Sequence, residues 1–171
     1  MIAPRVTIFS GYGINCQEES LHAIEQAGAV GDIVHINDAI ENPTMIEHSQ
    51  ILLFAGGFSY GDDTGAGNAY AKKMRNHLRD ELAASIERDT LILGICNGCQ
   101  ILAKLGLVGS AKNFVQSVSV SHNITNRYQC RWVHVKHDAK NNSPWLADIN
   151  QLFLPVAHGE GQFMMQDDVR Q

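Results

Sequence analysis

Short apolar runs recur along the first 105 residues and alternate with longer amphipathic segments. Each run has four or five residues, which is the length of a buried strand rather than of a helix. The run at residues 51–55 contains no polar residue, and this favours a parallel sheet that is covered on both faces. The expected strands are residues 6–9, 32–36, 51–55 and 91–94.

Apolar residues at helical spacing lie between these strands. Leu21, Ile24 and Ala27 follow this spacing within residues 18–27, and Gly28 is placed to end that helix. The alternation of strands and helices predicts an α/β fold with a doubly wound, mostly parallel sheet. The other expected helices are a short one opened by Pro43 with Met45 and Ile46 facing inward, one long polar helix over residues 68–88, and one that starts near Asn97.

The pattern changes after Gly106. Residues 129–136 alternate between polar and apolar as in an antiparallel strand, and residues 152–157 form another short apolar run. No low-complexity linker or internal repeat separates the two halves. We therefore expect an antiparallel extension of one domain that spans residues 1–171.

The composition excludes several classes of function. The chain has 171 residues and a net charge of −5, so it lacks the basic surface of a nucleic-acid-binding protein. No apolar run approaches the roughly 20 residues of a membrane span, and the first residues lack a signal peptide's apolar segment. Four cysteines are too few for a disulfide scaffold of this size, and no cluster has metal-site spacing. The expected location is the cytoplasm, with no membrane, nucleic acid or metal bound.

Cys96 is the strongest candidate for a chemically reactive residue. It lies between Gly94 and Gly98, where the fourth expected strand turns into a helix. In an open α/β sheet, ligands gather at the carboxyl ends of the strands. The G-x-C-x-G spacing is the cysteine version of a nucleophile elbow, and the start of a helix favours the thiolate. Free backbone N–H groups at such a turn can also bind a developing oxyanion.

Two other interpretations of Cys96 remain open at this point. Cys96 and Cys99 have the Cys-x-x-Cys spacing of a redox dithiol, although neither Trp nor Pro lies between them. Alternatively, both cysteines are structural, because buried cysteines are common in apolar surroundings.

Four segments together resemble the class I glutamine amidotransferases. The segment GICNGCQIL at residues 94–102 is similar to their nucleophile turn. Its Asn97 variant resembles the glutaminase component of phosphoribosylformylglycinamidine synthase, an enzyme of purine biosynthesis. The resemblance implies a flavodoxin-like form of the doubly wound sheet. The other three segments follow the order of this family: SGYGINCQEE at 10–19, AGGFSYGDDTGAGNAYA at 55–71 and LPVAHGEGQF at 154–163.

The resemblance also implies a mechanism. Cys96 would attack the side-chain amide of glutamine, form a glutamyl thioester and release ammonia, after which water would hydrolyse the thioester. The backbone N–H groups of Gly57 and Asn97 would form the oxyanion hole. The implied substrate-binding residues are Gly56, Phe58 and Gln100.

The implied partner is a synthetase subunit or domain, alone or with a small accessory subunit. There, ATP and magnesium would activate formylglycinamide ribonucleotide for its conversion by ammonia to the amidine. This chain has no G-x-x-x-x-G-K-[ST] motif, so we expect no ATP and no other cofactor to bind to it.

One part of the family pattern does not occur in these residues. The general base and its carboxylate partner are expected in a Pro-His-Pro-Glu segment, which residues 1–171 do not contain. We therefore expect the C-terminal portion of the domain to be missing. The spacing of His158 and Glu160 offers an alternative base and orienting carboxylate, whereas the resemblance places both in the supporting shell.

Two alternative functions follow from the same residues. One is a stand-alone cysteine hydrolase of the same fold, which would need neither glutamine nor a synthetase. The other is a non-catalytic interaction domain that keeps the elbow.

Overall fold

The computed structural model describes residues 3–109, 114–138 and 143–165. Contacts divide these residues into two compact units, and each is described by itself. The first unit contains the described residues up to Ser119 together with Met165, and the second contains Val120–Met164. The expectation of a single domain over residues 1–171 stays a prediction.

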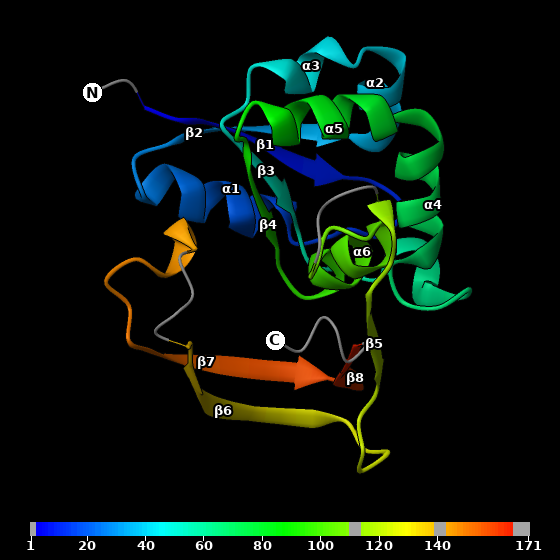
Figure 1. The fold of residues 1–171 in the computed structure, drawn as a ribbon, viewed down its shortest axis with the longest axis vertical. Helices are drawn as coiled ribbons and strands as arrows, with labels where there is room; N and C mark the ends of the chain where they lie inside the picture. The colour runs from blue at the N-terminus through cyan, green and yellow to red at the C-terminus, as the bar shows by residue number, and fades with distance from the viewer. Residues whose placement is uncertain (1–2, 110–113, 139–142, 166–171) are drawn as a thin grey trace. The chain divides into compact units, whose positions relative to one another are not determined.

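A four-stranded parallel sheet forms the centre of the first unit (Figure 1). Its strand order is β2-β1-β3-β4, which confirms the predicted doubly wound fold. Because all four strands run the same way, the loops that follow β1, β3 and β4 leave the sheet at one edge. The strands are β1 (Arg5–Ser10), β2 (Val30–His35), β3 (Ile51–Phe54) and β4 (Leu91–Gly94).

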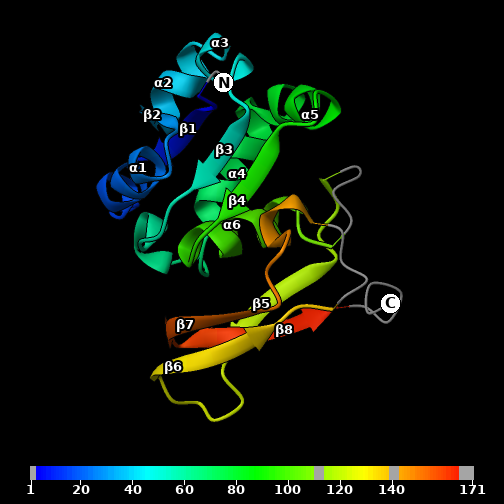
Figure 2. The same ribbon diagram turned by 90° about the vertical axis from the view of Figure 1, so that its left-hand side faces the viewer.

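Helices cover both faces of this sheet. Helix α1 lies on one face and α2, α3 and α5 on the other, as right-handed crossovers require, and α6 lies at the carboxyl ends of β3 and β4 (Figures 1 and 2). Among the described residues no helix has the length and apolar character to cross a membrane. The helices are α1 (Gln17–Gln26), α2 (Ile36–Glu41), α3 (Thr44–Glu47), α4 (Asn68–His77), α5 (Arg79–Glu87) and α6 (Asn97–Leu105), with a short 3-10 turn η1 (Ser59–Asp62).

The core lies around the two central strands. Phe9 of β1 and Phe54 of β3 are buried, and their ring centroids are 4.9 Å apart. Tyr70 of α4 is also fully buried, and its hydroxyl donates a 2.9 Å hydrogen bond to the carbonyl oxygen of Ser10. This bond ties α4 to the end of β1. Breaking it would leave an unpaired hydroxyl in an apolar core, which is costly.

The structure corrects the prediction of one long helix over residues 68–88. Two helices, α4 and α5, meet at Leu78, whose φ of −129° and ψ of 15° are not helical. Met74, Leu78 and Leu82 are fully buried and are spaced by four residues, as on one face of a continuous helix. The apolar pattern therefore hides the break. The break lets both α4 and α5 turn their apolar residues towards the core.

Two smaller expectations between β2 and β3 were wrong. Ile36 was expected to end the strand, but it begins α2, because the His35 side chain accepts a hydrogen bond from the Asn37 N–H and caps that helix. Ile46 is buried as expected, whereas Met45 is 44% exposed.

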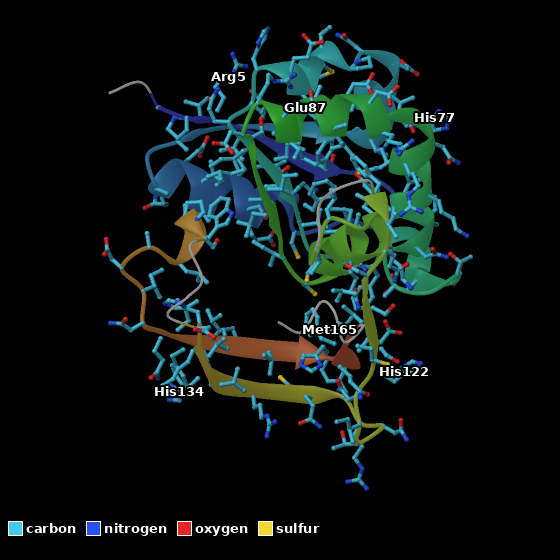
Figure 3. All side chains as sticks on the ribbon, viewed as in Figure 1. Arg5, His77, Glu87, His122, His134 and Met165 are labelled. Atoms are coloured by element: carbon cyan, nitrogen blue, oxygen red, sulfur yellow. The ribbon has the colours of Figure 1, made fainter. Side chains whose placement is uncertain are left out.

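The second unit is antiparallel, which confirms the predicted extension. Strands β6 (Gln129–Lys136) and β7 (Gln151–His158) pair over their whole length, and the short turn η3 (Pro144–Leu146) precedes β7. Strand β5 (Val118–His122) pairs with β8 (Glu160–Met165), which the apolar pattern did not indicate. The Phe153 ring stacks on Trp132 and His134, at centroid distances of 5.0 and 4.6 Å (His134 is labelled in Figure 3).

Gly98 allows α6 to start directly against the end of β3. A Cβ atom at position 98 would lie 1.9 Å from the Phe54 carbonyl oxygen, far inside van der Waals contact. No side chain larger than hydrogen fits there unless the helix moves.

We predict that Gly98→Ala lowers the free energy of unfolding by about 1–3 kcal/mol, because the added methyl group overpacks the contact. At an unhindered helical site the same change would instead raise stability by up to about 1 kcal/mol. Gly159→Ala is the control, since its Cβ would have Tyr128 at 3.9 Å as its nearest neighbour. Urea denaturation measures both variants, and a Gly98→Ala protein as stable as the wild type would contradict the close contact.

Candidate active site

The turn between β4 and α6 holds Cys96 in a strained conformation. Its φ is 54° and its ψ is −115°, a region that residues with a side chain rarely adopt. Cys96 is exposed and immediately precedes α6, whose first backbone N–H groups have no partners inside the helix. This geometry is that of the nucleophile elbow predicted from the glycine spacing.

Close backbone packing behind Cys96 depends on small residues. The Ile95 N–H donates a 3.0 Å hydrogen bond to the Phe54 carbonyl oxygen, which continues the β3–β4 pairing up to the turn. A Cβ atom on Gly94 would come within 2.6 Å of the Leu102 side chain and 2.9 Å of the Cys99 nitrogen. Gly94 and Gly98 therefore let the first turn of α6 fold back onto the sheet.

The loop after β3 lies beside Cys96. A Cβ atom on Gly56 would be 3.3 Å from the Cys96 Cβ atom, so the two backbone segments touch. Gly57 has a φ of 150°, and a Cβ atom there would lie 2.4 Å from the Gly13 carbonyl oxygen. The loops after β1 and β3 interlock at this point, where Ile14 and Gly57 form an isolated antiparallel bridge.

Two backbone N–H groups are open at this junction. The Asn15 N–H bonds to the Gly56 carbonyl oxygen, and the Phe58 N–H bonds to the Gly13 carbonyl oxygen. Between these bonds, the Gly57 N–H has no acceptor within residues 3–109, 114–138 and 143–165, and neither has the Asn97 N–H at the start of α6. They are the two donors expected to form the oxyanion hole, and both belong to segments that adjoin Cys96.

The remaining predicted substrate residues lie around the same edge of the sheet. Gln100 is half-buried in the first turn of α6, and its Oε1 atom accepts a 3.0 Å hydrogen bond from the Asn97 amide. Phe58 follows Gly57, and its side chain is 65% exposed. Their roles in binding a substrate stay predictions.

The Asn97 side chain is a feature that sequence reasoning missed. It is 1% exposed and bonds to Ser59 and Asp62 in the loop after β3. The signal in the sequence was an asparagine at the variable position between Cys96 and Gly98. A polar residue at this position does not reveal which residues it hydrogen-bonds to.

Three thiols lie at or beside the elbow, those of Cys96, Cys16 and Cys99, and their environments differ. The Cys16 Sγ atom lies 3.5 Å from the position of a Cβ on Gly56, which brings Cys16 close to Cys96. Loss of water, followed by the charges of Glu19 and Cys96, raises the pKa of the Cys16 thiol. Burial raises the pKa of the half-buried Cys99 thiol, and Cys96 adds to the effect. None of these cysteines is in a disulfide.

His158 and Glu160 belong to the second unit. The His158 Nδ1 atom is 2.9 Å from Asn123 Oδ1, and the Asn123 amide nitrogen already donates to the carbonyl oxygens of His158 and Arg127. The imidazole therefore donates from Nδ1. The Glu160 carboxylate lies 3.8 Å from the His122 ring. Asn123 is thus an orienting partner of His158 that the spacing alone did not indicate.

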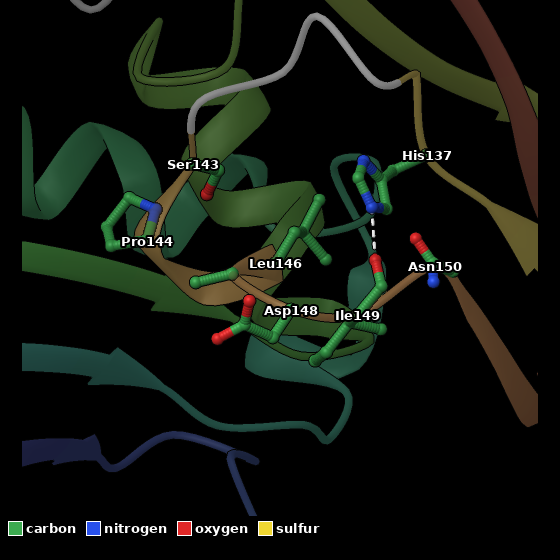
Figure 4. A pocket seen from close by; sticks show the side chains of 8 residues that line it. His137, Ser143, Pro144, Leu146, Asp148, Ile149 and Asn150 are labelled. Atoms are coloured by element: carbon green, nitrogen blue, oxygen red, sulfur yellow. Dashed lines mark hydrogen bonds between the residues drawn. The ribbon is translucent and has the colours of Figure 1, made fainter.

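The second unit contains a hollow lined by its own residues (Figure 4). The His137 ring hydrogen-bonds to the Ile149 carbonyl oxygen at its edge, and no cysteine lines it. No group of three or more His, Cys, Asp or Glu residues in the described part of the chain could hold a metal ion.

The chain is similar to proteins of known family over almost its whole length. Residues 3–171 match the CobB/CobQ-like glutamine amidotransferase domain. The chain is 48% identical over 166 residues to the phosphoribosylformylglycinamidine synthase subunit PurQ of Methanococcus maripaludis, covering 95% of this chain and 60% of the relative. It is 37% identical to the PurQ subunit of Dehalococcoides mccartyi, covering 92% of this chain and 62% of that relative. The chain thus spans about 60% of the length of these curated relatives.

Solved structures share the fold. One chain of the PurLQS structure from Thermotoga maritima has a TM-score of 0.79 and 28% identity, covering 98% of this chain and 72% of that one. A glutamine amidotransferase of Thermotoga maritima, at a TM-score of 0.57 and 18% identity, covers 96% of this chain and 64% of that one, and supports the fold alone.

We predict that iodoacetamide at neutral pH alkylates Cys96 before Cys16 and Cys99. The raised pKa of the other two thiols leaves less thiolate at neutral pH, and their reaction should accelerate only as the pH rises above the usual thiol range. Peptide mass spectrometry across a pH series measures each site. Cys99→Ser should leave the labelling of Cys96 intact, and faster labelling of Cys99 than of Cys96 would contradict the elbow assignment.

Proposed function

The chain belongs to the CobB/CobQ-like glutamine amidotransferase family, and on that premise we propose that Cys96 is the nucleophile of a glutaminase. One observation carries the proposal: the strained, positive-φ turn at Cys96 adjoins two segments whose backbone N–H groups, at Gly57 and Asn97, are open. A cysteine beside two such donors suits acyl transfer, in which a thiolate attacks a carbonyl and an oxyanion forms.

The reaction proceeds through a thioester. The Cys96 sulfur bonds to the side-chain amide carbon of glutamine, and the amide oxygen takes the negative charge. The Gly57 and Asn97 N–H groups donate to that oxygen, and collapse of the intermediate expels the amide nitrogen, which is protonated and leaves as ammonia. Water then attacks the thioester, and glutamate and the free thiol result. Gly56, Phe58 and Gln100 bind the glutamine.

The ammonia is consumed by a synthetase component in the cytoplasm. The similarity to PurQ subunits and to a chain of the PurLQS structure supports this assignment. The synthetase, alone or with a small accessory subunit, uses ATP and magnesium to convert formylglycinamide ribonucleotide to the amidine. This chain itself carries the glutamine chemistry and no cofactor.

The general base is a histidine of a Pro-His-Pro-Glu segment in the complete protein, and the family resemblance gives His158 and Glu160 a supporting role. In the alternative, His158 itself is the base. Its Nδ1 donates to Asn123, which leaves Nε2 to take a proton, as in a Cys-His-Asn arrangement. That arrangement would also suit a stand-alone cysteine hydrolase, so the identity of the base separates the candidate functions.

We expect Cys96→Ala in the complete protein to reduce ammonia release from glutamine by more than about 10³-fold, because the thioester cannot form. Cys99→Ala should retain most of the activity, since the half-buried Cys99 thiol takes no part. Glutamate and ammonia are measured together at saturating glutamine. Equal losses in the two variants would argue against a single nucleophile at Cys96.

We expect a protein of residues 1–171 to release ammonia from glutamine about 10²–10⁴-fold more slowly than the complete protein, because general acid–base assistance is lost. His158→Ala in the complete protein should retain most of the activity. Robust turnover by residues 1–171 that His158→Ala abolishes would instead make His158 the base and Asn123 its orienting partner.

A further inference from the structure

The Asn97 side chain joins the elbow to the loop after β3. Its Oδ1 atom accepts a 3.1 Å hydrogen bond from the Ser59 N–H, and its Nδ2 atom donates to Asp62 Oδ1 at 3.1 Å. A third bond, 3.0 Å from Nδ2 to Gln100 Oε1, stays within α6. A backbone N–H can only donate and a carboxylate oxygen accepts, so these partners fix which way the amide points. Asn97 is 1% exposed, and both the oxygen and the nitrogen of its side-chain amide have hydrogen-bond partners.

The loop segment that Asn97 holds is strained. Tyr60, Gly61 and Asp62 have φ values of 53°, 64° and 55°, all in the left-handed region. Such a conformation persists at residues with side chains only where the surroundings hold it. On the outer side, the Tyr60 N–H bonds to the Tyr12 carbonyl oxygen at 2.6 Å, and the two tyrosine rings stack with centroids 4.6 Å apart. On the inner side, the partner of Asp62 is Asn97.

These bonds decide which N–H of the loop stays open. The Phe58 N–H is bonded to Gly13, and the Ser59 N–H is bonded to the Asn97 side chain, whereas the Gly57 N–H has no acceptor in the described part of the chain. The second open donor is the backbone N–H of Asn97 itself. One residue therefore supplies one of the donors and holds the loop that supplies the other.

We propose that the Asn97 side chain is a positioning residue that holds the Gly57 and Asn97 N–H groups at one shared oxyanion site. This inference rests on the proposed glutaminase function. An oxyanion is stabilised only when both donors lie about 3 Å from the position that the charge will occupy. Without the bonds to Ser59 and Asp62, the strained turn relaxes and Gly57 moves away from the elbow, although Cys96 keeps its place between β4 and α6.

The closing experiment compares Asn97→Asp with wild type in the complete protein together with its synthetase component. The substitution preserves size and the acceptor for the Ser59 N–H, but it turns an oxygen towards Asp62 Oδ1 and Gln100 Oε1. We expect kcat for ammonia release to fall about 10²–10³-fold, the effect of losing one oxyanion donor. KM for glutamine should change much less than kcat, because the lost donor acts mainly in the transition state, and any change in KM reports the lost bond to Gln100.

A second readout separates positioning from damage to the elbow. Iodoacetamide alkylates a thiolate by displacement of iodide, and no oxyanion forms. Measured at a pH above the usual thiol range, where a carboxylate at position 97 no longer limits the thiolate fraction, the rate of Cys96 alkylation in Asn97→Asp should stay within about twofold of wild type, while glutamyl thioester formation falls with kcat. A merely structural role of Asn97 would lower both rates together.

A reciprocal exchange tests the bond to Asp62. In Asn97→Asp with Asp62→Asn, an amide at position 62 can donate to a carboxylate at position 97, so we expect about a tenfold recovery of kcat over Asn97→Asp alone. Asn68→Asp is the matched control, because the Asn68 amide bonds to the Thr64 carbonyl oxygen in the same loop but outside this network. It should leave kcat unchanged.

Three results would overturn the inference: an Asn97→Asp protein with wild-type kcat, a parallel loss of alkylation and turnover, or a higher KM with unchanged kcat. A wild-type protein that hydrolyses no glutamine overturns the proposed function, and this inference with it. An active wild type beside an equally active Asn97→Asp overturns the inference alone, so the two failures are distinguishable.

Discussion

The contact between Gly98 and the Phe54 carbonyl oxygen determines where Cys96 lies. Helix α6 can start against the end of β3 only because position 98 carries no side chain. The chain must then pass from β4 into α6 within two residues, and Cys96 takes a strained conformation with a positive φ to do so. The buried face of α6, including Ile101 and Leu105, holds the helix in place and offsets this strain.

Close backbone contact also determines the conformation of the loops after β1 and β3. Gly13 and Gly57 bring the loops after β1 and β3 into backbone contact, and a side chain on either would collide with a carbonyl oxygen. Parallel strands deliver both loops and the elbow to one edge of the sheet, although they are distant in sequence. The proposed oxyanion donors are backbone groups, so in this proposal their positions depend on glycines and on the buried Asn97 amide with its partners Ser59 and Asp62.

The three neighbouring thiols show how environment separates residues of one type. Cys96 is exposed on the turn, whereas burial raises the pKa of Cys99 one helical turn away. Cys16 reaches the same place from the loop after β1, and its pKa is raised as well. The Cys-x-x-Cys spacing therefore brings two thiols close together along the chain without making them equivalent. The reactivity of each thiol depends on its position in the fold more than on the motif.

The sequence by itself determined the parallel sheet, the elbow and the antiparallel extension. Apolar runs and glycine positions are local signals, and the predicted strand at residues 91–94, the helix start at Asn97 and the strand at 129–136 agree with the structure. Only the tertiary structure decided the break at Leu78, the pairing of Asn97 with Ser59 and Asp62, and that of His158 with Asn123. These side-chain partners are 35 or more residues apart along the chain, and a hydrogen bond over that separation leaves no periodic trace in the sequence. The break at Leu78 is hidden for a related reason, because its buried neighbours keep helical spacing while the packing of α4 and α5 sets the bend.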